Sequence, residues 1–318
     1  MRRTIIIGNK VQCDFFAENI GQIDNCEIVG FYDPYAGANA NAAMNAIDII
    51  ELNNKAEVFV IDNKTFKEFY ESIETLIKFG KDILVNGYLA LEYNGLRKLE
   101  NLTFESGSTL QIGNVLRNKP LYAAASQIIK KPRYIKLSKN TPNPEKGNFE
   151  QWVNNQLVEE LDTVLRLSGA NFRSVAARPL FLYSSTPDML SIHIEFDNDA
   201  ICQITAGSAV ANGKNKAQFF QKDRLISLDF ANNQLKEFRL KDESMQLSMI
   251  NDDEVKSTEF TEIERSIMPY DIWVKEWKNF DESIGKAITP LTSISDCQNL
   301  QMIVDSIMDK VYRKYQAV

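Results

Sequence analysis

The chain has 318 residues and a formal net charge of -7, with 44% hydrophobic and 25% charged residues. This length favours two domains, and this composition is typical of a globular protein with hydrophobic cores. The acidic balance argues against a general nucleic-acid surface, which would need an excess of basic residues. No apolar run approaches the ~18 residues of a membrane helix, and no signal-peptide core follows Met1. We therefore expect a cytoplasmic protein with no membrane partner.

The four cysteines are widely spaced, and none forms a C-x-x-C pair: Cys13, Cys26, Cys202 and Cys297. The spacing indicates neither a zinc ribbon nor a redox motif, so no metal site is predicted. Free, buried thiols in a reducing compartment are the simpler interpretation.

The start of the chain has the layout of a βαβ dinucleotide site. A strand at 3–7 leads into Gly8, an amphipathic helix covers about 11–20, and a second strand at 27–32 ends at Asp33. In such a unit the helix N-terminus receives a pyrophosphate and the carboxylate binds the ribose diol. The charge of Asp33 would repel a 2′-phosphate, which favours NAD(H) over NADP(H). A simple strand-end turn is the alternative role of this aspartate.

The glycine pattern inside this unit is altered. The motif G-x-G-x-x-G appears as Gly8-Asn9-Lys10-Val11-Gln12-Cys13, so only the first glycine is present. Lys10 stands where glycine lets the backbone approach the pyrophosphate. Its side chain would either block that approach or pair its ammonium group with phosphate. Cys13 is small enough to let helix and strand pack closely, and we do not expect it to be a catalytic thiol.

Strands and helices continue to alternate up to Gly113. A buried strand is expected at 56–62, a helix at 64–79 that ends at Gly80, and a further strand at 81–85. Another helix and two short strands complete this part. Such alternation indicates a parallel sheet covered on both faces. We therefore predict a Rossmann dinucleotide-binding domain over 1–115.

Beyond residue 120 the pattern changes to short alternating strands and a few helices. The expected strands are 134–139, 190–196, 200–205, 217–220, 225–230 and 235–240, and the expected helices are 149–168, 270–284 and 296–312. This pattern favours an antiparallel sheet with one face covered by helices. We predict a C-terminal α+β domain over 116–318, whose closing helix at 296–312 is a candidate to pack back on the N-terminal domain.

The sequence resembles the Gfo/Idh/MocA oxidoreductases in several stretches that occur in order. Gly8 with Asp33 is similar to the family's phosphate turn and ribose carboxylate, and 79–85 to its helix-to-strand junction. The runs 112–120 and 159–169 are similar to its strand "vgfnrRfdP" and its helix "HDIDLARWLLG", and the stretch from Phe280 to Asp296 to its C-terminal ending. The resemblance runs nearly end to end. It implies an α/β protein with an N-terminal Rossmann parallel sheet and a C-terminal domain with an open, mainly antiparallel sheet.

The resemblance implies an NAD(P)-dependent oxidoreductase that acts on a sugar or polyol derivative, with NAD as the expected cofactor. The implied cofactor-binding residues are Gly8, Asn9, Lys10, Asp33 and Asn86. The family's E-K-P tripeptide, which supplies a lysine beside the nicotinamide, is here Asn86-Gly87-Tyr88. Its usual general acid/base histidine aligns with Glu159. These departures keep a second hypothesis open, a catalytically degenerate relative that serves as a ligand-binding or assembly protein.

Alcohol oxidation by hydride transfer needs a group that removes the hydroxyl proton. Glu159 suits this role if burial raises its pKa, and Asp162, three residues later on the same helix face, could orient it or the substrate. A solvated acidic helix start is the alternative. Tyr88 and Arg117 are candidates for substrate binding, although a buried structural ion pair is an equal alternative for Arg117. The single histidine, His193, lies on the polar side of an alternating strand and is not expected to be catalytic.

The predicted C-terminal sheet also suggests self-association. An open sheet needs its second face covered, and an exposed apolar face is an association surface. We therefore expect a homodimer or tetramer through that sheet, as the resemblance also implies, and a sugar-like small molecule as the other partner.

Overall fold

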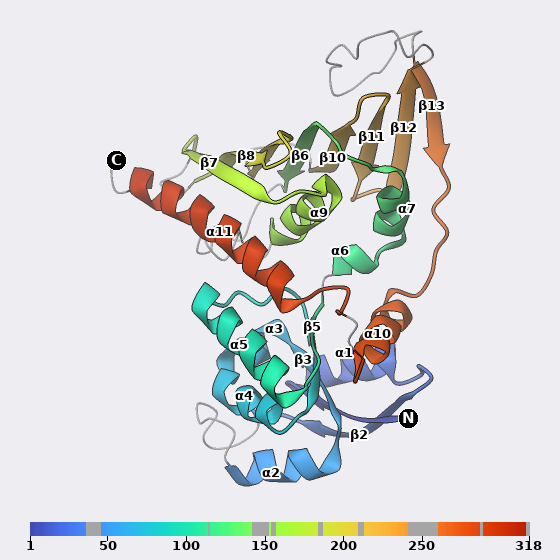
Figure 1. Ribbon diagram of the computed structural model, residues 1–318, viewed down its shortest axis with the longest axis vertical. Helices are drawn as coiled ribbons and strands as arrows, with labels where there is room; N and C mark the ends of the chain where they lie inside the picture. The colour runs from blue at the N-terminus through green and yellow to red at the C-terminus, as the bar shows by residue number, and fades with distance from the viewer. Residues whose placement is uncertain are drawn as a thin grey trace. The chain divides into compact units, whose positions relative to one another are not determined.

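The computed structural model describes residues 1–35, 46–113, 115–141, 153, 157–183, 187–208, 213–240, 260–286 and 289–315. They form two compact units, the first made of Met1–Asn118 with Tyr270–Met302 and the second of Lys119–Pro269 with Ile303–Val318. Figure 1 labels most of the helices and strands of both units. Within these residues no helix is both long and apolar enough to span a membrane.

The first unit contains a parallel sheet whose described strands lie in the order β2-β1-β3-β4-β5. Its strands are β1 Arg2–Ile7, β2 Cys26–Tyr32, β3 Val58–Asp62, β4 Asp82–Asn86 and β5 Leu110–Ile112. Every described pairing in it is parallel. The strand order reverses beside β1, which is the arrangement of a Rossmann half, so the predicted N-terminal fold is confirmed.

Helices cover both faces of this sheet. They are α1 Lys10–Ile20, α2 Ala46–Lys55, α3 Asn63–Glu68, α4 Tyr70–Lys78, α5 Tyr93–Ser106, α6 Val115–Asn118, α10 Ile272–Ser283 and the start of α11 Ile294–Tyr315. On one face Phe59 and Ile61 pack with side chains of α3, α4 and α5. On the other face Val60 packs with Phe16 of α1 and Trp277 of α10. The alternation of buried residues along β3 thus separates two cores.

The helix expected at 64–79 is two helices. Asp62 caps α3, and its Oδ1 atom accepts hydrogen bonds from the N–H groups of Lys64 and Thr65. Phe69 then leaves helical geometry, with φ of -111° and ψ of 31°, and its ring packs edge-on against Tyr35 at 5.3 Å. The expected end of the second helix is confirmed, because Gly80 has φ of +75°.

The second unit contains a mixed sheet in which β6 and β9 are parallel and the other described pairs are antiparallel. In its described part the order is β13-β12-β11-β10-β6-β9-β8-β7. The strands are β6 Tyr134–Asn140, β7 Phe172–Leu180, β8 Met189–Phe196, β9 Ile201–Gly207, β10 Lys214–Phe220, β11 Arg224–Asp229, β12 Gln234–Leu240 and β13 Phe260–Arg265. The predicted, mainly antiparallel sheet is confirmed, although β7 and β13 were not expected.

Helices α7 Pro120–Ile128 and α9 Val158–Ser168 lie on one side of this sheet (Figure 1). They contact β11, β12 and β6. The strands alternate accordingly, so that Ile192 and Ile194 are buried while His193 is half-exposed. The predicted helix at 149–168 is described continuously from Val158, and most of its earlier part lies outside the described residues.

Candidate functional site

The turn between β1 and α1 is the expected phosphate turn. The Gly8 N–H group donates to the carbonyl oxygen of Tyr32 on β2, with N and O 3.0 Å apart. A Cβ atom at Gly8 would lie 2.7 Å from Oε1 of Gln12. A larger residue at position 8 would therefore require the Gln12 side chain to move.

The N-terminus of α1 is capped by its own side chains. The N–H group of Gln12 donates to Oδ1 of Asn9 at 3.1 Å, and the N–H group of Asn9 donates to Oε1 of Gln12 at 2.7 Å. This reciprocal capping box satisfies two donors that a helix N-terminus would otherwise offer to an anion. A phosphate that used the Asn9 N–H group would have to displace the Gln12 side chain.

Lys10 and Cys13 occupy the two altered glycine positions. Lys10 is exposed and is not among the described non-glycine residues with positive φ, so it introduces no left-handed strain. Cys13 is buried, with its Sγ atom 3.4 Å from the Gly8 carbonyl oxygen. Burial, helped by nearby Asp33, raises the pKa of Cys13 to about 11. Its thiol is therefore protonated and inert at neutral pH.

Asp33 lies directly after β2, at its carboxyl end. Its Oδ1 atom accepts a hydrogen bond from the N–H group of Tyr35 at 2.9 Å, which shapes the turn beyond the strand. The Tyr35 hydroxyl group in turn donates to Oε2 of Glu68 at 2.7 Å. Asp33 thus lies at the strand end where a ribose-binding carboxylate is predicted from the sequence, and in the structure it serves the strand-end turn.

The end of β4 carries the tripeptide Asn86-Gly87-Tyr88. Gly87 has φ of +93°, and a Cβ atom there would lie 3.1 Å from Nδ2 of Asn63. The same Nδ2 atom donates to the Tyr88 carbonyl oxygen at 2.8 Å, and the Tyr88 hydroxyl group donates to Gln301. The backbone at Gly87 therefore has a conformation that disfavours the lysine of the resembling family.

Arg117 is only 2% exposed and lies in α6. Its Nη1 atom donates to the Leu291 carbonyl oxygen at 2.8 Å and pairs with Oδ2 of Asp296 at 3.0 Å. Of the two roles considered for Arg117, the structure contains the buried ion pair. This pair ties α6 to the start of α11 within the first unit.

The first turn of α9 carries the acid/base candidates. Glu159 is half-buried, and burial, followed by the neighbouring charge of Glu160, raises its pKa. Glu160 is buried and accepts hydrogen bonds from Nζ of Lys139 at 2.5 Å and Nδ2 of Asn215 at 2.8 Å. Asp162 is also buried. Of the three, Glu159 is the accessible one, and its raised pKa suits a proton carrier.

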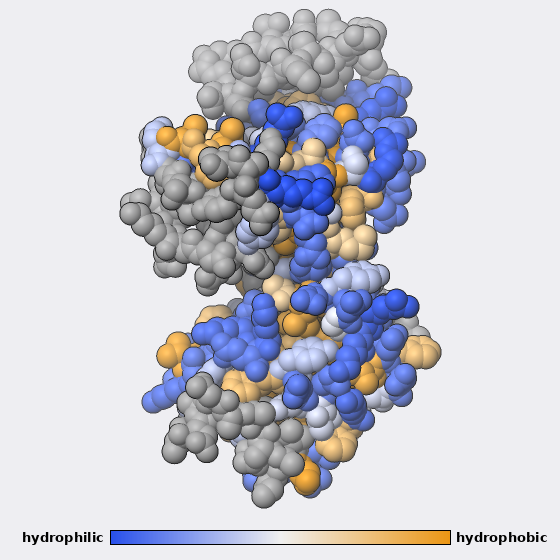
Figure 2. Space-filling model, turned by 90° about the vertical axis from the view of Figure 1, so that its left-hand side faces the viewer, coloured by the Kyte–Doolittle hydropathy of each residue, from blue (hydrophilic) through white to orange (hydrophobic). Residues whose placement is uncertain are grey.

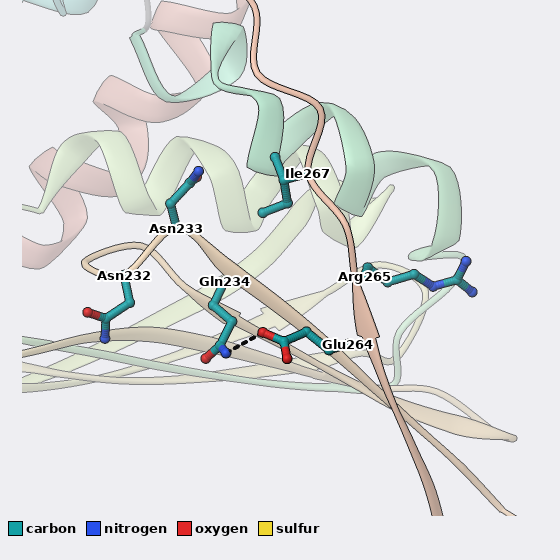
Figure 3. A pocket seen from close by; sticks show the side chains of 6 residues that line it. All are labelled: Asn232, Asn233, Gln234, Glu264, Arg265 and Ile267. Carbon is teal, nitrogen blue, oxygen red and sulfur yellow. Dashed lines mark hydrogen bonds between the residues drawn. The ribbon is translucent and has the colours of Figure 1, made fainter.

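A pocket of about 480 Å³ lies at the turn between β11 and β12 and beside β13. In Figure 3 its lining side chains include Gln234, which donates to Glu264 at 2.6 Å, while the Arg265 side chain points away from them. Arg265 instead binds the buried Glu237. None of the predicted site residues lines this pocket, and nothing in it matches the chemistry expected from the sequence.

The first unit also contains a buried carboxyl group that was not predicted from the sequence. Glu276 of α10 is 3% exposed, and burial raises its pKa to about 7. One signal was available: Glu276 follows Trp273 by three residues and precedes Phe280 by four, so it lies within the apolar stripe of its helix. A charged residue in such a stripe departs from the expected pattern.

The parallel sheet of the first unit and the mixed sheet of the second form a fold that several solved dehydrogenases share. No protein-family model matches the sequence. UDP-N-acetylglucosamine 3-dehydrogenase from Acidithiobacillus ferrooxidans is 22% identical over 241 residues, which is 73% of this chain and 75% of that protein.

Solved structures share this fold over nearly the whole chain. The structure of UDP-N-acetylglucosamine 3-dehydrogenase GnnA from Acidithiobacillus ferrooxidans matches with a TM-score of 0.82 and 18% identity over 99% of both chains. A dehydrogenase (MviM) from Clostridium difficile matches with a TM-score of 0.76 and 14% identity, covering 98% of this chain and 99% of that one. A putative myo-inositol dehydrogenase from Sinorhizobium meliloti matches with a TM-score of 0.71 and 14% identity, covering 99% and 98%. At these identities the likeness shows the fold.

Proposed function

We propose that this chain is an NAD-dependent oxidoreductase that acts on a sugar derivative, with a UDP-linked sugar as the first substrate to test. The observation that carries the proposal is the Rossmann unit from Gly8 to Asp33, set in a chain that matches a UDP-N-acetylglucosamine 3-dehydrogenase structure over 99% of its length. Fold alone does not fix function, so the residues of the site must also suit the reaction.

Asp33 suits the ribose of a dinucleotide, and the N-terminus of α1 suits its pyrophosphate if the Gln12 side chain moves. Asp33 supports NAD(H) over NADP(H), because a carboxylate accepts hydrogen bonds from a ribose diol and repels a 2′-phosphate. At the other end, α1 offers its N-terminus to a pyrophosphate once the Gln12 side chain leaves the Asn9 N–H group. The exposed Lys10 would then add a charge-assisted contact to phosphate.

The chemistry assigned to the protein is removal of one proton. An oxidised nicotinamide supplies the hydride acceptor when it is bound. Ionised Glu159 accepts the hydroxyl proton of the substrate while the carbinol C–H bond breaks and the C=O bond forms. A raised pKa makes Glu159 a stronger base than an ordinary glutamate, which suits this step.

The rival proposal is a relative that binds a ligand without turning it over. Two observations favour it: the capping box that occupies the Asn9 N–H group, and Gly87 in a conformation that excludes the family's lysine. Both lie at positions where a working dehydrogenase of the resembling family offers donors or a charged side chain.

Thermal unfolding with NAD(H) and NADP(H) titrated separately tests the proposal. A ligand at 100 times its Kd adds about 2.7 kcal/mol to the free energy of unfolding, and we expect a larger shift with NADH than with NADPH. Asp33→Ala should remove this preference, whereas Asp24→Ala, an exposed change in the turn before β2, should not. No shift with either cofactor at millimolar concentration would reject the dehydrogenase proposal. A shift without turnover of UDP-linked sugars or polyols would favour the binding role.

A further inference from the structure

A cluster of buried polar atoms lies between the ends of β4 and β5 and helix α10. Each of the following atoms is buried and has no hydrogen-bond partner among the described residues: Oδ1 of Asn86, Oε1 and Nε2 of Gln111, Oε1 of Glu276 and Nε1 of Trp277. Such atoms each cost free energy unless water or a ligand satisfies them. Gln111 is 0% and Glu276 is 3% exposed, so bulk solvent does not satisfy these atoms.

The backbone register brings these side chains to the same face of the sheet. Gln111 is paired with Leu84, and Leu84 packs in the same core as Trp277. Asn86 is two residues beyond Leu84, so strand alternation sends its side chain to the α10 face as well. A Cβ atom at Gly113 would lie 2.6 Å from Oε1 of Glu276 and 3.5 Å from Cα of Asn86. Gly113 thus leaves room for the Glu276 carboxyl group beside the end of β4.

The occupant must satisfy both donors and acceptors. Trp277 Nε1 and Gln111 Nε2 are donors, whereas Asn86 Oδ1 and Gln111 Oε1 are acceptors. A metal ion would suit only the acceptors. Water can donate and accept, and buried waters typically make about three hydrogen bonds to otherwise unsatisfied groups.

Among the residues that the structure describes, Glu276 forms no ion pair with a lysine or arginine. The charged groups on the neighbouring elements are paired elsewhere or exposed: Arg117 of α6 binds Asp296, Asp281 of α10 binds Arg2, and Lys10, Asp14 and Glu18 of α1 are exposed. Asp82 at the start of β4 accepts a hydrogen bond from the Thr109 N–H group at 2.7 Å. A buried carboxyl group without a positive partner favours its neutral form, in which it donates a hydrogen bond.

We propose that Glu276 is a positioning residue which, through ordered water, fixes the orientation of the Asn86 amide at the cofactor end of β4. Asn86 is half-buried, with Oδ1 directed inward. A neutral Glu276 donates toward this oxygen and leaves the Asn86 NH₂ group outward, as a donor for a ligand. An ionised Glu276 only accepts, so the amide turns over and presents its oxygen outward. The protonation state of Glu276 thereby decides whether Asn86 offers a ligand a hydrogen-bond donor or an acceptor.

The first experiment does not depend on any ligand. Infrared spectra of protein labelled with ¹³C-glutamate should show the carbonyl band of a protonated carboxylic acid at pH 6, which fades as the pH passes through about 7. In a Glu159→Gln background, which removes the other glutamate whose pKa burial raises, Glu276→Gln should abolish this band, and Glu282→Gln, the same change at an exposed position of α10, should retain it. A band that persists in Glu276→Gln, or that has already vanished at pH 6, overturns the proposal.

The second experiment measures NADH affinity between pH 6 and pH 8.5, and this part rests on the proposed function. The loss of one hydrogen bond predicts affinity weaker by roughly threefold to tenfold at the higher pH. Glu276→Gln and Asn86→Ala should both remove the pH dependence, although only Glu276→Gln removes the infrared band. If NADH does not bind at all, the proposed function fails, while the band still decides the state of Glu276. An unchanged pH dependence in Glu276→Gln overturns the positioning role.

Discussion

Glu159 is the residue on which a catalytic function depends most. Burial raises its pKa, so catalysis by its ionised form should increase as the pH rises through that elevated value. Glu159→Gln should lower kcat by roughly 10²-fold to 10⁴-fold and abolish this pH dependence. The matched control is Glu71→Gln, at an exposed position in the first turn of α4. Turnover that is equal in both variants would identify Glu159 as a structural helix-start residue.

The same pKa makes a prediction about stability. A carboxyl group whose pKa is raised on folding favours the folded state below its unfolded pKa and loses that contribution as the pH rises through the folded pKa. Wild-type protein should therefore lose more thermal stability than Glu159→Gln between pH 5 and pH 8. Melting temperatures at both pH values measure this. Equal losses of stability in the two proteins would contradict the raised pKa of Glu159.

Gly87 shows why the family's lysine cannot simply be restored. Gly87→Lys combines φ of +93° with a Cβ atom 3.1 Å from Asn63 Nδ2, and we expect it to cost about 1–3 kcal/mol of stability. Gly107→Lys is the control, because it has φ of +69° but nothing within 4 Å of its Cβ position. Urea unfolding should give a lower free energy of unfolding for Gly87→Lys than for Gly107→Lys. Equal losses would mean that backbone strain alone, and not crowding at Asn63, excludes the side chain.

At the scale of elements, the capping box of α1 stabilises the helix but occupies an N–H group that a nucleotide would use. Gln12→Ala frees the Asn9 N–H group, so NADH should bind more tightly. The loss of the cap should cost on the order of 1 kcal/mol. Gln12→Glu keeps a capping carboxylate and should preserve stability, but its charge should repel the pyrophosphate and weaken NADH binding. Weaker binding by Gln12→Ala would show that the box organises the turn for the ligand.

The elements that local sequence encodes were predictable, and those that depend on distant packing were not. The apolar run of β1, the single Gly8 and the acidic end of β2 are all local signals. The break between α3 and α4 is not, because helical spacing continues through it and only Asp62 capping and the packing of Phe69 on Tyr35 set it. β7 was not predicted. Its Pro179 is a poor strand signal, but β7 lies at the edge of the described sheet, where proline is tolerated.

The candidate site divides in the same way. Its positions at Gly8, Asp33 and Gly87 could be found from residue type and order along the chain. The raised pKa values of Glu159 and Glu276 could not, because burial by residues far apart in sequence causes them. The capping box was visible in sequence as Asn9 followed three residues later by Gln12, and its consequence for the pyrophosphate became clear only from the geometry of Gly8.

At the scale of the molecule, the expected association depends on the sheet face opposite α7 and α9. Ile201 on this face is 37% exposed, and its register partner Tyr134 contacts Phe220 with ring centroids 5.4 Å apart. Polar side chains such as Lys136 and Gln203 form the neighbouring register row. On the view in Figure 2, the hydrophobic residues of the described chain also form small groups among hydrophilic ones. An interface here would therefore combine a short apolar row with polar contacts.

We expect sedimentation equilibrium to show a dimer or tetramer at micromolar concentration. Ile201→Asp should shift the equilibrium from oligomer towards monomer, because association would bury a carboxylate without a partner in the apolar row. Val29→Asp makes the same change at a 39% exposed strand position of the first unit and should leave the assembly intact. A wild-type monomer would refute association through this sheet. An oligomer that Ile201→Asp leaves unchanged would place the interface on another surface.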